Sequence, residues 1–364
     1  MIGHFRSNLV MLYFLAFLAV FGQSDIAEAQ AGSFQSVMRQ GRAEYDSGHF
    51  ASAERLFAEA LVQLGARDDS QRSKVLADLG STYEKQEAFQ KAEKAFSESL
   101  SISKRLGEKN DCALMLHNLA MLYSREGRND EAIRLLSQAQ DYIKSNPDAD
   151  PKIAAEVLNG MGVVSYRRGD NGKAVTYLNR ALQAVSSPAI QFDAAGIYNN
   201  LGAAYVAQHD YRQAEETLKL ALSMKEAKFG RSHPNLIPTL NLIGLVYAET
   251  RRFAEAEDQY RRSLKILEPQ GASSALKTAE TLHGLSDTYL KANRTAESAA
   301  ALEQAAQIAQ SHLDQEPEMT AIAEEYSRVL KAQGKVKEAQ DLHAKASRAR
   351  SVTGLVVNAN SLVQ

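Results

Sequence analysis

The sequence contains one cysteine, no tryptophan and only seven prolines in 364 residues. A single thiol cannot form an intramolecular disulfide or a thiolate metal cluster. Cys112 lies in an apolar stretch with helical spacing, which favours a buried structural thiol over a reactive one. The formal net charge is only −2, so the composition indicates neither a basic nucleic-acid-binding surface nor an acidic disordered tail.

The N-terminal apolar run is too short to be a typical membrane span. It extends from Leu9 to Phe21, whereas a spanning helix needs about 20 residues. Arg6 precedes the run, and small-x-small cleavage sites follow at 27–29 and 29–31. This pattern predicts a secretory signal peptide over residues 1–29, with the mature chain starting at Gln30 or Gly32 in the periplasm or outside the cell. An uncleaved membrane anchor is the alternative.

A pattern of about 40 residues recurs eight times between residues 33 and 347. Its first marker is a small residue that returns in steps of 39 to 42: Gly41, Gly80, Ala120, Gly162, Gly202, Gly244, Ser286 and Ser327. A second small residue follows twelve places later, for example Ala53, Ala92 and Ala214, and an aromatic or leucine comes four places after that. These intervals are helical, so each unit is predicted to be two amphipathic helices that approach closely at the small residues.

The turns between the paired helices carry glycines at Gly48, Gly127, Gly169 and Gly334, which suits the left-handed conformation that ends a helix. One helical pair cannot bury its own apolar face, whereas a stack of pairs can. The sequence therefore predicts an all-α fold over residues 33–347, followed by a C-terminal tail over 348–364 whose apolar residues lack a helical period.

These slots resemble the tetratricopeptide repeat (TPR), and the long step resembles the kinesin light chain-like branch. The best-matching stretches are Leu-Asn-Leu-Ile-Gly-Leu-Val-Tyr at 240–247 and the linker Phe-Gly-Arg-Ser-His-Pro at 229–234. The resemblance implies a right-handed superhelical solenoid of about eight helical hairpins with a concave groove. The first and last units depart from the pattern at Glu44 and His343, as terminal caps with polar outer faces do.

A polar ladder stands three places before the small-residue slot. It consists of His117, Asn159, Asn199, Asn241 and His283, and the resemblance places it on the groove side of the first helices. An asparagine amide offers both a donor and an acceptor and can pair with a peptide group. The ladder is therefore the candidate peptide-binding site. The alternative is that these side chains bridge neighbouring helices internally.

Basic residues accompany the ladder, namely Arg125, Arg167, Arg168 and Lys291. They could grip an acidic peptide or a free carboxylate, although charged helical residues are more often a solvated face. His117 and His283 lie four repeats apart and cannot share an ion. No His-x-x-x-His or Cys/His cluster is present, so no metal site is predicted.

The sequence contains no recognisable catalytic motif. Gly169-Asp-Asn-Gly-Lys-Ala lacks the spacing of a phosphate-binding loop, and there is no Gly-x-Ser-x-Gly elbow. The sequence therefore predicts an exported scaffold that binds a segment of a partner protein, with no enzymatic activity, no cofactor, no small-molecule substrate and no nucleic acid. The alternative function is a structural protein that assembles with itself or with envelope components and exposes an apolar patch.

Overall fold

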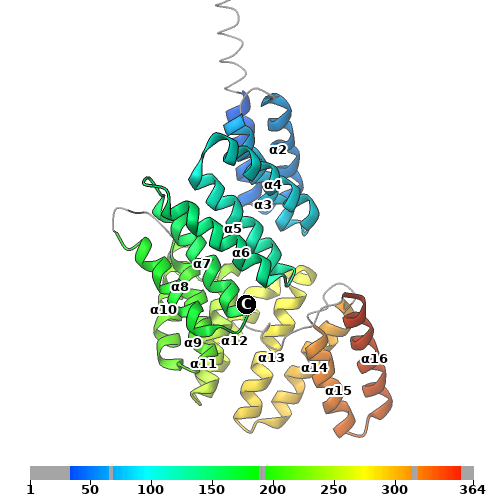
Figure 1. Cartoon of the computed structure of the whole chain (residues 1–364). Coiled ribbons are helices and arrows are strands. Elements are labelled where there is room, and N and C mark those ends of the chain that lie inside the picture. The colour runs from blue at the N-terminus through cyan, green and yellow to red at the C-terminus, as the bar shows by residue number, and fades with distance from the viewer. Residues whose placement is uncertain (1–32, 65–68, 188–189, 191–192, 314–318, 354–364) are drawn as a thin grey trace, which may run out of the picture. The chain divides into compact units, whose positions relative to one another are not determined.

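The computed structural model of the chain describes residues 33–64, 69–187, 190, 193–313 and 319–353. Within these ranges every regular element is a helix, and none is a strand. The all-α solenoid class predicted from the sequence is confirmed (Figure 1). The chain divides into two compact units, residues 1–160 and 161–364, and the boundary falls inside helix α7.

The first unit contains three complete hairpins and the start of a fourth. Short turns join consecutive helices, which pack against each other. The helices are residues 33–46, α2 (Phe50–Leu64), α3 (Asp69–Lys85), α4 (Phe89–Leu106), α5 (Lys109–Arg125), α6 (Asn129–Lys144) and the first part of α7 (Pro151–Arg167).

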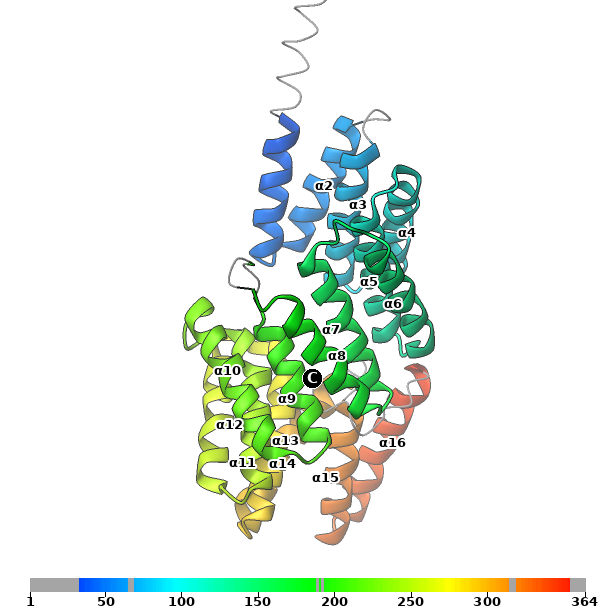
Figure 2. The ribbon, with the colours of Figure 1, turned by 60° about the vertical axis from the view of Figure 1, so that its left-hand side comes forward.

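The second unit continues the same alternation of first and second helices, which a rotated view also shows (Figure 2). Its elements are α8 (Asn171–Ala184), α9 (Ala195–Ala207), α10 (Tyr211–Phe229), the 3-10 turn η1 (Pro234–Leu236), α11 (Ile237–Glu249), α12 (Phe253–Leu267), η2 (Glu268–Ser274), α13 (Ala275–Lys291), α14 (Thr295–His312), α15 (Thr320–Ala332) and α16 (Val336–Thr353). The described residues thus contain eight hairpins, as the repeat count predicted.

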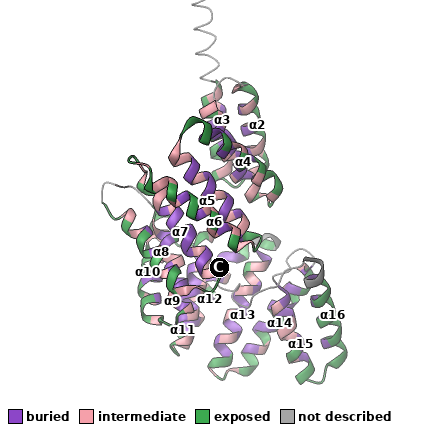
Figure 3. Cartoon of the chain, in the orientation of Figure 1, coloured by how far each residue is buried: buried purple, intermediate pink, exposed green. Residues whose placement is uncertain are grey.

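Close approach at the small-residue slots holds each hairpin together. A Cβ added at Gly80 would stand 2.5 Å from the ring of Phe96, and one added at Gly202 would stand 2.5 Å from Leu218. Both partners are fully buried. Buried residues accordingly line the faces where helices meet, and exposed residues lie on the outer faces (Figure 3). The sequence prediction that small residues admit a large neighbour is confirmed.

Two later hairpins replace the glycine with serine. Ser286 Oγ donates a hydrogen bond to the backbone oxygen of Ser298 at 2.9 Å, and Ser327 Oγ donates to that of Ala339 at 2.8 Å. All four residues are buried. A buried hydroxyl without a partner would cost free energy, so these bonds allow serine to fill a glycine slot.

The turns between paired helices use left-handed residues, only half of them glycine. Gly48, Gly127, Gly169 and Gly334 have φ between 78° and 80°, as predicted. The remaining four turns place Glu87, His209, Arg251 and Asn293 at φ between 58° and 63°. A non-glycine residue is uncommon in this conformation, so helix packing on both sides of the turn must hold it there.

The structure bears on the predicted boundary between the repeats and the C-terminal tail. Helix α16 continues to Thr353, beyond the predicted repeat boundary at residue 347. The signal peptide predicted over 1–29 and the rest of the tail, residues 354–364, lie outside the described residues. No described helix combines the length and apolar content that crossing a membrane requires.

Candidate functional site

In the first unit the ladder consists of one histidine and one asparagine. His117 lies on α5 with its imidazole against Gly160 of α7, so that a Cβ at Gly160 would stand 2.8 Å from Nδ1. The ring is partly exposed, but Nδ1 is enclosed and has no hydrogen-bond partner among the described residues. Loss of solvent lowers the pKa of His117 to about 4. Asn159, also on α7, is half-buried.

In the second unit each ladder side chain bonds to the next first helix. Asn199 on α9 accepts a hydrogen bond from Thr239 on α11 at 2.7 Å. Asn241 on α11 donates to Thr281 on α13 at 2.9 Å. The structure therefore gives this part of the ladder an internal bridging role between repeats, one of the two interpretations that the sequence left open.

The last residue of the ladder, His283, also contacts the next first helix, and its partner there is a charged residue. His283 on α13 lies 2.7 Å from Oε2 of Glu325 on α15, measured from Nε2. His283 is mostly buried, and its contact with Glu325 connects α13 to α15, which are the first helices of the last two hairpins.

The bridging hydrogen bonds engage only one polar atom of each of the amides of Asn199 and Asn241. Nδ2 of Asn199 makes no hydrogen bond with a described residue. Oδ1 of Asn241 is buried and likewise has no partner among them. Asn199 and Asn241 therefore each have one polar side-chain atom that is hydrogen-bonded and one that has no partner among the described residues.

Two of the basic residues predicted to accompany the ladder are paired with acids. In the first unit, Arg125 binds Glu84 of α3 at 3.0 Å. In the second unit, Lys291 binds Glu249 of α11. Arg167 and Arg168 also make interactions within the protein. Since their charges are balanced locally, Arg125 and Lys291 are weaker candidates for gripping an anion than the sequence suggested.

A basic hollow lies near Asn199, and no motif in the sequence predicts it. Its volume is about 270 Å³, and it is lined by Asp193, Ala195, Gly196, Lys225, Phe229, Pro234, Asn235, Pro238 and Lys277. Lys225 donates to Thr239 at 2.8 Å, and Thr239 donates in turn to Asn199. A chain of hydrogen bonds thus connects the hollow to the ladder.

The charge balance of this basic hollow is positive. Asp193 is already paired with Lys228 at 2.6 Å. Lys277 is exposed and makes no ion pair with a described residue. Burial lowers the pKa of Lys225, partly opposed by Asp193. A carboxylate entering the hollow would therefore meet the ammonium groups of Lys225 and Lys277, with Asp193, already paired with Lys228, as the one acidic side chain in the lining.

The linker at 229–234 builds one wall of the hollow. Phe229 ends α10 and its ring stacks on His233 with centroids 4.7 Å apart. His233 Nδ1 accepts a hydrogen bond from the backbone N–H of Asn235. Gly230, which follows Phe229, has a φ of 83°. The segment that most resembled the kinesin light chain-like branch therefore has a defined place in the structure.

A larger hollow of about 700 Å³ lies among α12, α13 and α14. Its lining includes Leu264, Leu282 and Ile308 but none of the ladder residues. Its size alone does not connect it to the polar groups described above.

A recurring arginine stabilises the repeats and was missed in the sequence. Arg128, Arg252 and Arg294 stand just before a second helix, each bound to a glutamate three residues later. Each guanidinium also covers a tyrosine five residues earlier, with distances of 3.6, 4.0 and 4.3 Å to the ring centroids. The sequence indicates this contact through a Tyr-x4-Arg-x2-Glu spacing that recurs in the three repeats. These side chains are structural contacts rather than ligand donors.

Family models for the tetratricopeptide repeat match residues 38–107, 111–187, 193–268 and 278–317. A curated relative, Protein KINESIN LIGHT CHAIN-RELATED 3 of Arabidopsis thaliana, is 26% identical over 206 residues. The match covers 56% of this chain and 32% of that protein. The chain thus spans about a third of the length of this relative.

Solved structures show the same fold at low identity. BtubC (BKLC) from P. vanneervenii superposes with a TM-score of 0.53 at 20% identity, covering 61% of this chain and 91% of that one. A signal-transduction ATPase with a tetratricopeptide repeat sensor from Pyrococcus horikoshii gives 0.55 at 18% identity, with 74% and 40% covered. The Cut9–Hcn1 complex of the APC/C gives 0.52 at 20% identity, with 66% and 41% covered.

Proposed function

Since the chain belongs to the tetratricopeptide repeat family, with kinesin light chain-like repeats, we propose that it binds a segment of a partner protein on the ladder side of its second unit. The coarser role of protein-interaction scaffold follows from the repeats themselves. Proteins built from these repeats are typically non-catalytic. The finer proposal concerns which surface engages the partner and through which chemistry.

The observation that carries the proposal is the basic hollow with its hydrogen-bond chain. Lys225 uses one of its three ammonium donors on Thr239, and Lys277 has no ion pair with a described residue. Bonds from ammonium to carboxylate are charge-assisted and stronger than neutral ones. We propose that a partner segment places an acidic side chain or its terminal carboxylate here.

The ladder contributes in a secondary way. Asn199 has an unengaged amide nitrogen about one helical turn from Ala195 and Gly196, which line the hollow. An extended segment anchored by its carboxylate would pass this donor on α9. Asn199 therefore remains a proposed backbone contact in this unit. Asn241 acts as a bridge instead, because its Nδ2 is engaged with Thr281 and its Oδ1 is buried. His283 remains a proposed contact of the second unit, and His117 and Asn159 remain proposed contacts of the first unit.

Export is part of the proposed function. The support is the sequence pattern of Arg6, a short apolar run and paired small-residue cleavage sites. An exported scaffold would meet its partner in the periplasm or outside the cell. The structural alternative, self-assembly, has less support: the exposed large apolar residues Val62, Leu106, Leu220, Leu290 and Val336 lie on five different helices.

Site-specific photo-crosslinking tests the proposal. Gly196 lines the hollow and is exposed, and a Cβ built there meets no atom within 4 Å, so benzoyl-phenylalanine is introduced at this position. Leu220, which is exposed on α10, is the matched control. We expect one protein to be captured in the native envelope through residue 196, through a peptide that carries an acidic residue or a C-terminus. Equal capture of the same peptide from residue 220 would contradict the proposed surface.

A further inference from the structure

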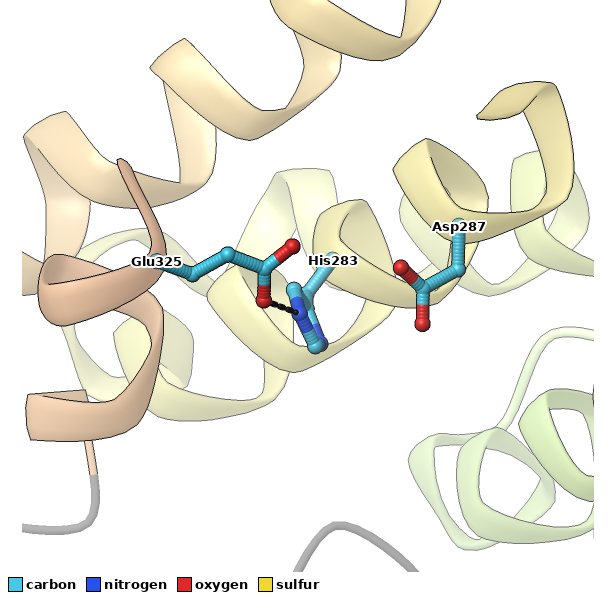
Figure 4. Close-up of side chains that lie close together, drawn as sticks. All are labelled: His283, Asp287 and Glu325. Atoms are coloured by element: carbon cyan, nitrogen blue, oxygen red, sulfur yellow. Dashed lines mark hydrogen bonds and ion pairs between the residues drawn. The ribbon is translucent and has the colours of Figure 1, made fainter. Parts of the chain in front are cut away.

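Three potential metal ligands converge between α13 and α15. One candidate donor atom each from His283, Asp287 and Glu325 lies within 4.8 Å of the other two. His283 and Asp287 stand one helical turn apart on α13, and Glu325 reaches across from the next first helix (Figure 4). Figure 4 shows the imidazole between the two carboxylates.

The chemical types match a divalent transition ion. Zinc binds imidazole nitrogen and carboxylate oxygen, and sites with three protein ligands keep a fourth position open. Magnesium and calcium prefer sets made entirely of oxygen. One imidazole with two carboxylates therefore favours zinc over these harder ions.

The geometry is close to that required. Tetrahedral zinc with bonds of about 2.1 Å places its ligand atoms roughly 3.4 Å apart. The observed limit of 4.8 Å therefore has to shorten by no more than roughly 1.4 Å. Rotation of the Asp287 and Glu325 side chains between staggered rotamers can supply such movements.

The electrostatics of the cluster also favour a cation. Asp287 is half-buried and makes no hydrogen bond or ion pair with a described residue. The nearest cation along the helix, Lys291, is already bound to Glu249.

From this arrangement we propose that His283, Asp287 and Glu325 form a zinc-class binding site that cross-links α13 to α15. The site shares no residue with the basic hollow. Because both helices are first helices of successive hairpins, the ion would fasten the last repeat to the one before it. The fourth coordination position would be left for water or a group from a partner.

Titration calorimetry on the full mature chain, first stripped with a chelator, tests the site with zinc chloride alone. We expect one Zn²⁺ per chain. Asp287→Asn should weaken binding by more than the about 10- to 100-fold that loss of an outer-shell partner costs. Asp258→Asn makes the same change at an exposed position of α12 and should leave the affinity unchanged.

A second readout locates the ion. Amide hydrogen exchange should slow in α13 and α15 when zinc is added to the wild type, and it should not change in Asp287→Asn. Glu325→Gln, which keeps an acceptor for His283, should show the same loss of affinity if Asp287→Asn does not fold. The proposal is overturned if either folded variant binds zinc as the wild type does, if the wild type does not bind, or if Ca²⁺ binds more tightly than Zn²⁺.

Discussion

Replacing Gly202 by alanine should destabilise the second unit even though alanine is the better helix former. The added Cβ would stand 2.5 Å from both Cγ and Cδ2 of Leu218. Leu218 has no exposed surface, so it has no open space into which to retreat. The methyl group therefore has to displace packed atoms of the hairpin.

The magnitude follows from two opposing effects. Overpacking a well-packed core costs about 1–3 kcal/mol. Alanine in place of glycine in a helix recovers about 1 kcal/mol. We expect the free energy of unfolding to fall by up to about 2 kcal/mol.

Gly196 provides a control on the same helix. It is exposed, and nothing lies within 4 Å of a Cβ built there. Gly196→Ala should therefore stabilise by up to about 1 kcal/mol, since only the helix propensity changes. Comparing the two variants largely removes the propensity effect and isolates the clash with Leu218.

Urea denaturation followed by circular dichroism measures the two stabilities, and hydrogen exchange locates the change. Stability in a repeat array is a sum of local and nearest-neighbour contributions. Protection should therefore be lost mainly in α8 to α11. If Gly202→Ala is as stable as Gly196→Ala, or if protection falls evenly along the chain, the account of close helix approach is wrong.

Three further predictions test other parts of the account. N-terminal sequencing of the exported protein should begin at Gln30 or Gly32, and an intact Met1 on a membrane-bound protein would contradict the signal peptide. Replacing Asn199 and Asn241 together by alanine should lower the free energy of unfolding by about 0.5–1.5 kcal/mol per bridging bond in urea titrations, and an unchanged midpoint would show that these bridges contribute nothing. The pKa of His117 in the folded chain, about 4, lies below its ordinary value of about 6.5. The unfolded chain therefore binds more protons than the folded chain between these pH values, and the free energy of unfolding should fall by at most about 3 kcal/mol as the pH drops from 6.5 to 4. His117→Gln should remove this pH dependence.

The repeat register was predictable because it depends on spacing alone. Small residues at Gly41, Gly80 and Gly202 mark the same contact in each hairpin, and the structure confirms the contact through Phe57, Phe96 and Leu218. Glycine turns were equally visible. The left-handed turns at residues such as Glu87 and Asn293 could not be predicted, because helix packing, and not the residue type, imposes the left-handed conformation there.

The functional groups were only partly predictable. The ladder was found, but its partners Thr239, Thr281 and Glu325 lie about 40 residues away on the next first helix. Local motif searches do not detect such pairs. The same reason explains why a search for His-x-x-x-His spacing missed the cluster of His283 and Asp287, whose third ligand comes from another helix.

The basic hollow depended on folding of the linker. Lys225 and Lys277 belong to different hairpins, and neither belongs to the ladder. Their common environment arises because the 229–234 segment turns at Gly230 and places Phe229 and Pro234 on the hollow's wall. No periodic pattern in the sequence links these positions.

The most direct test of the central claim is the affinity of the full chain for the segment captured through residue 196, measured by fluorescence anisotropy. Lys277→Glu should weaken binding by about tenfold or more, since a charge-assisted bond contributes about 1.5–3 kcal/mol. Lys331→Glu makes the same charge change at an exposed position of α15 and should alter the affinity by less than about twofold. Equal weakening by the two variants, or none by Lys277→Glu, would contradict binding at the basic hollow.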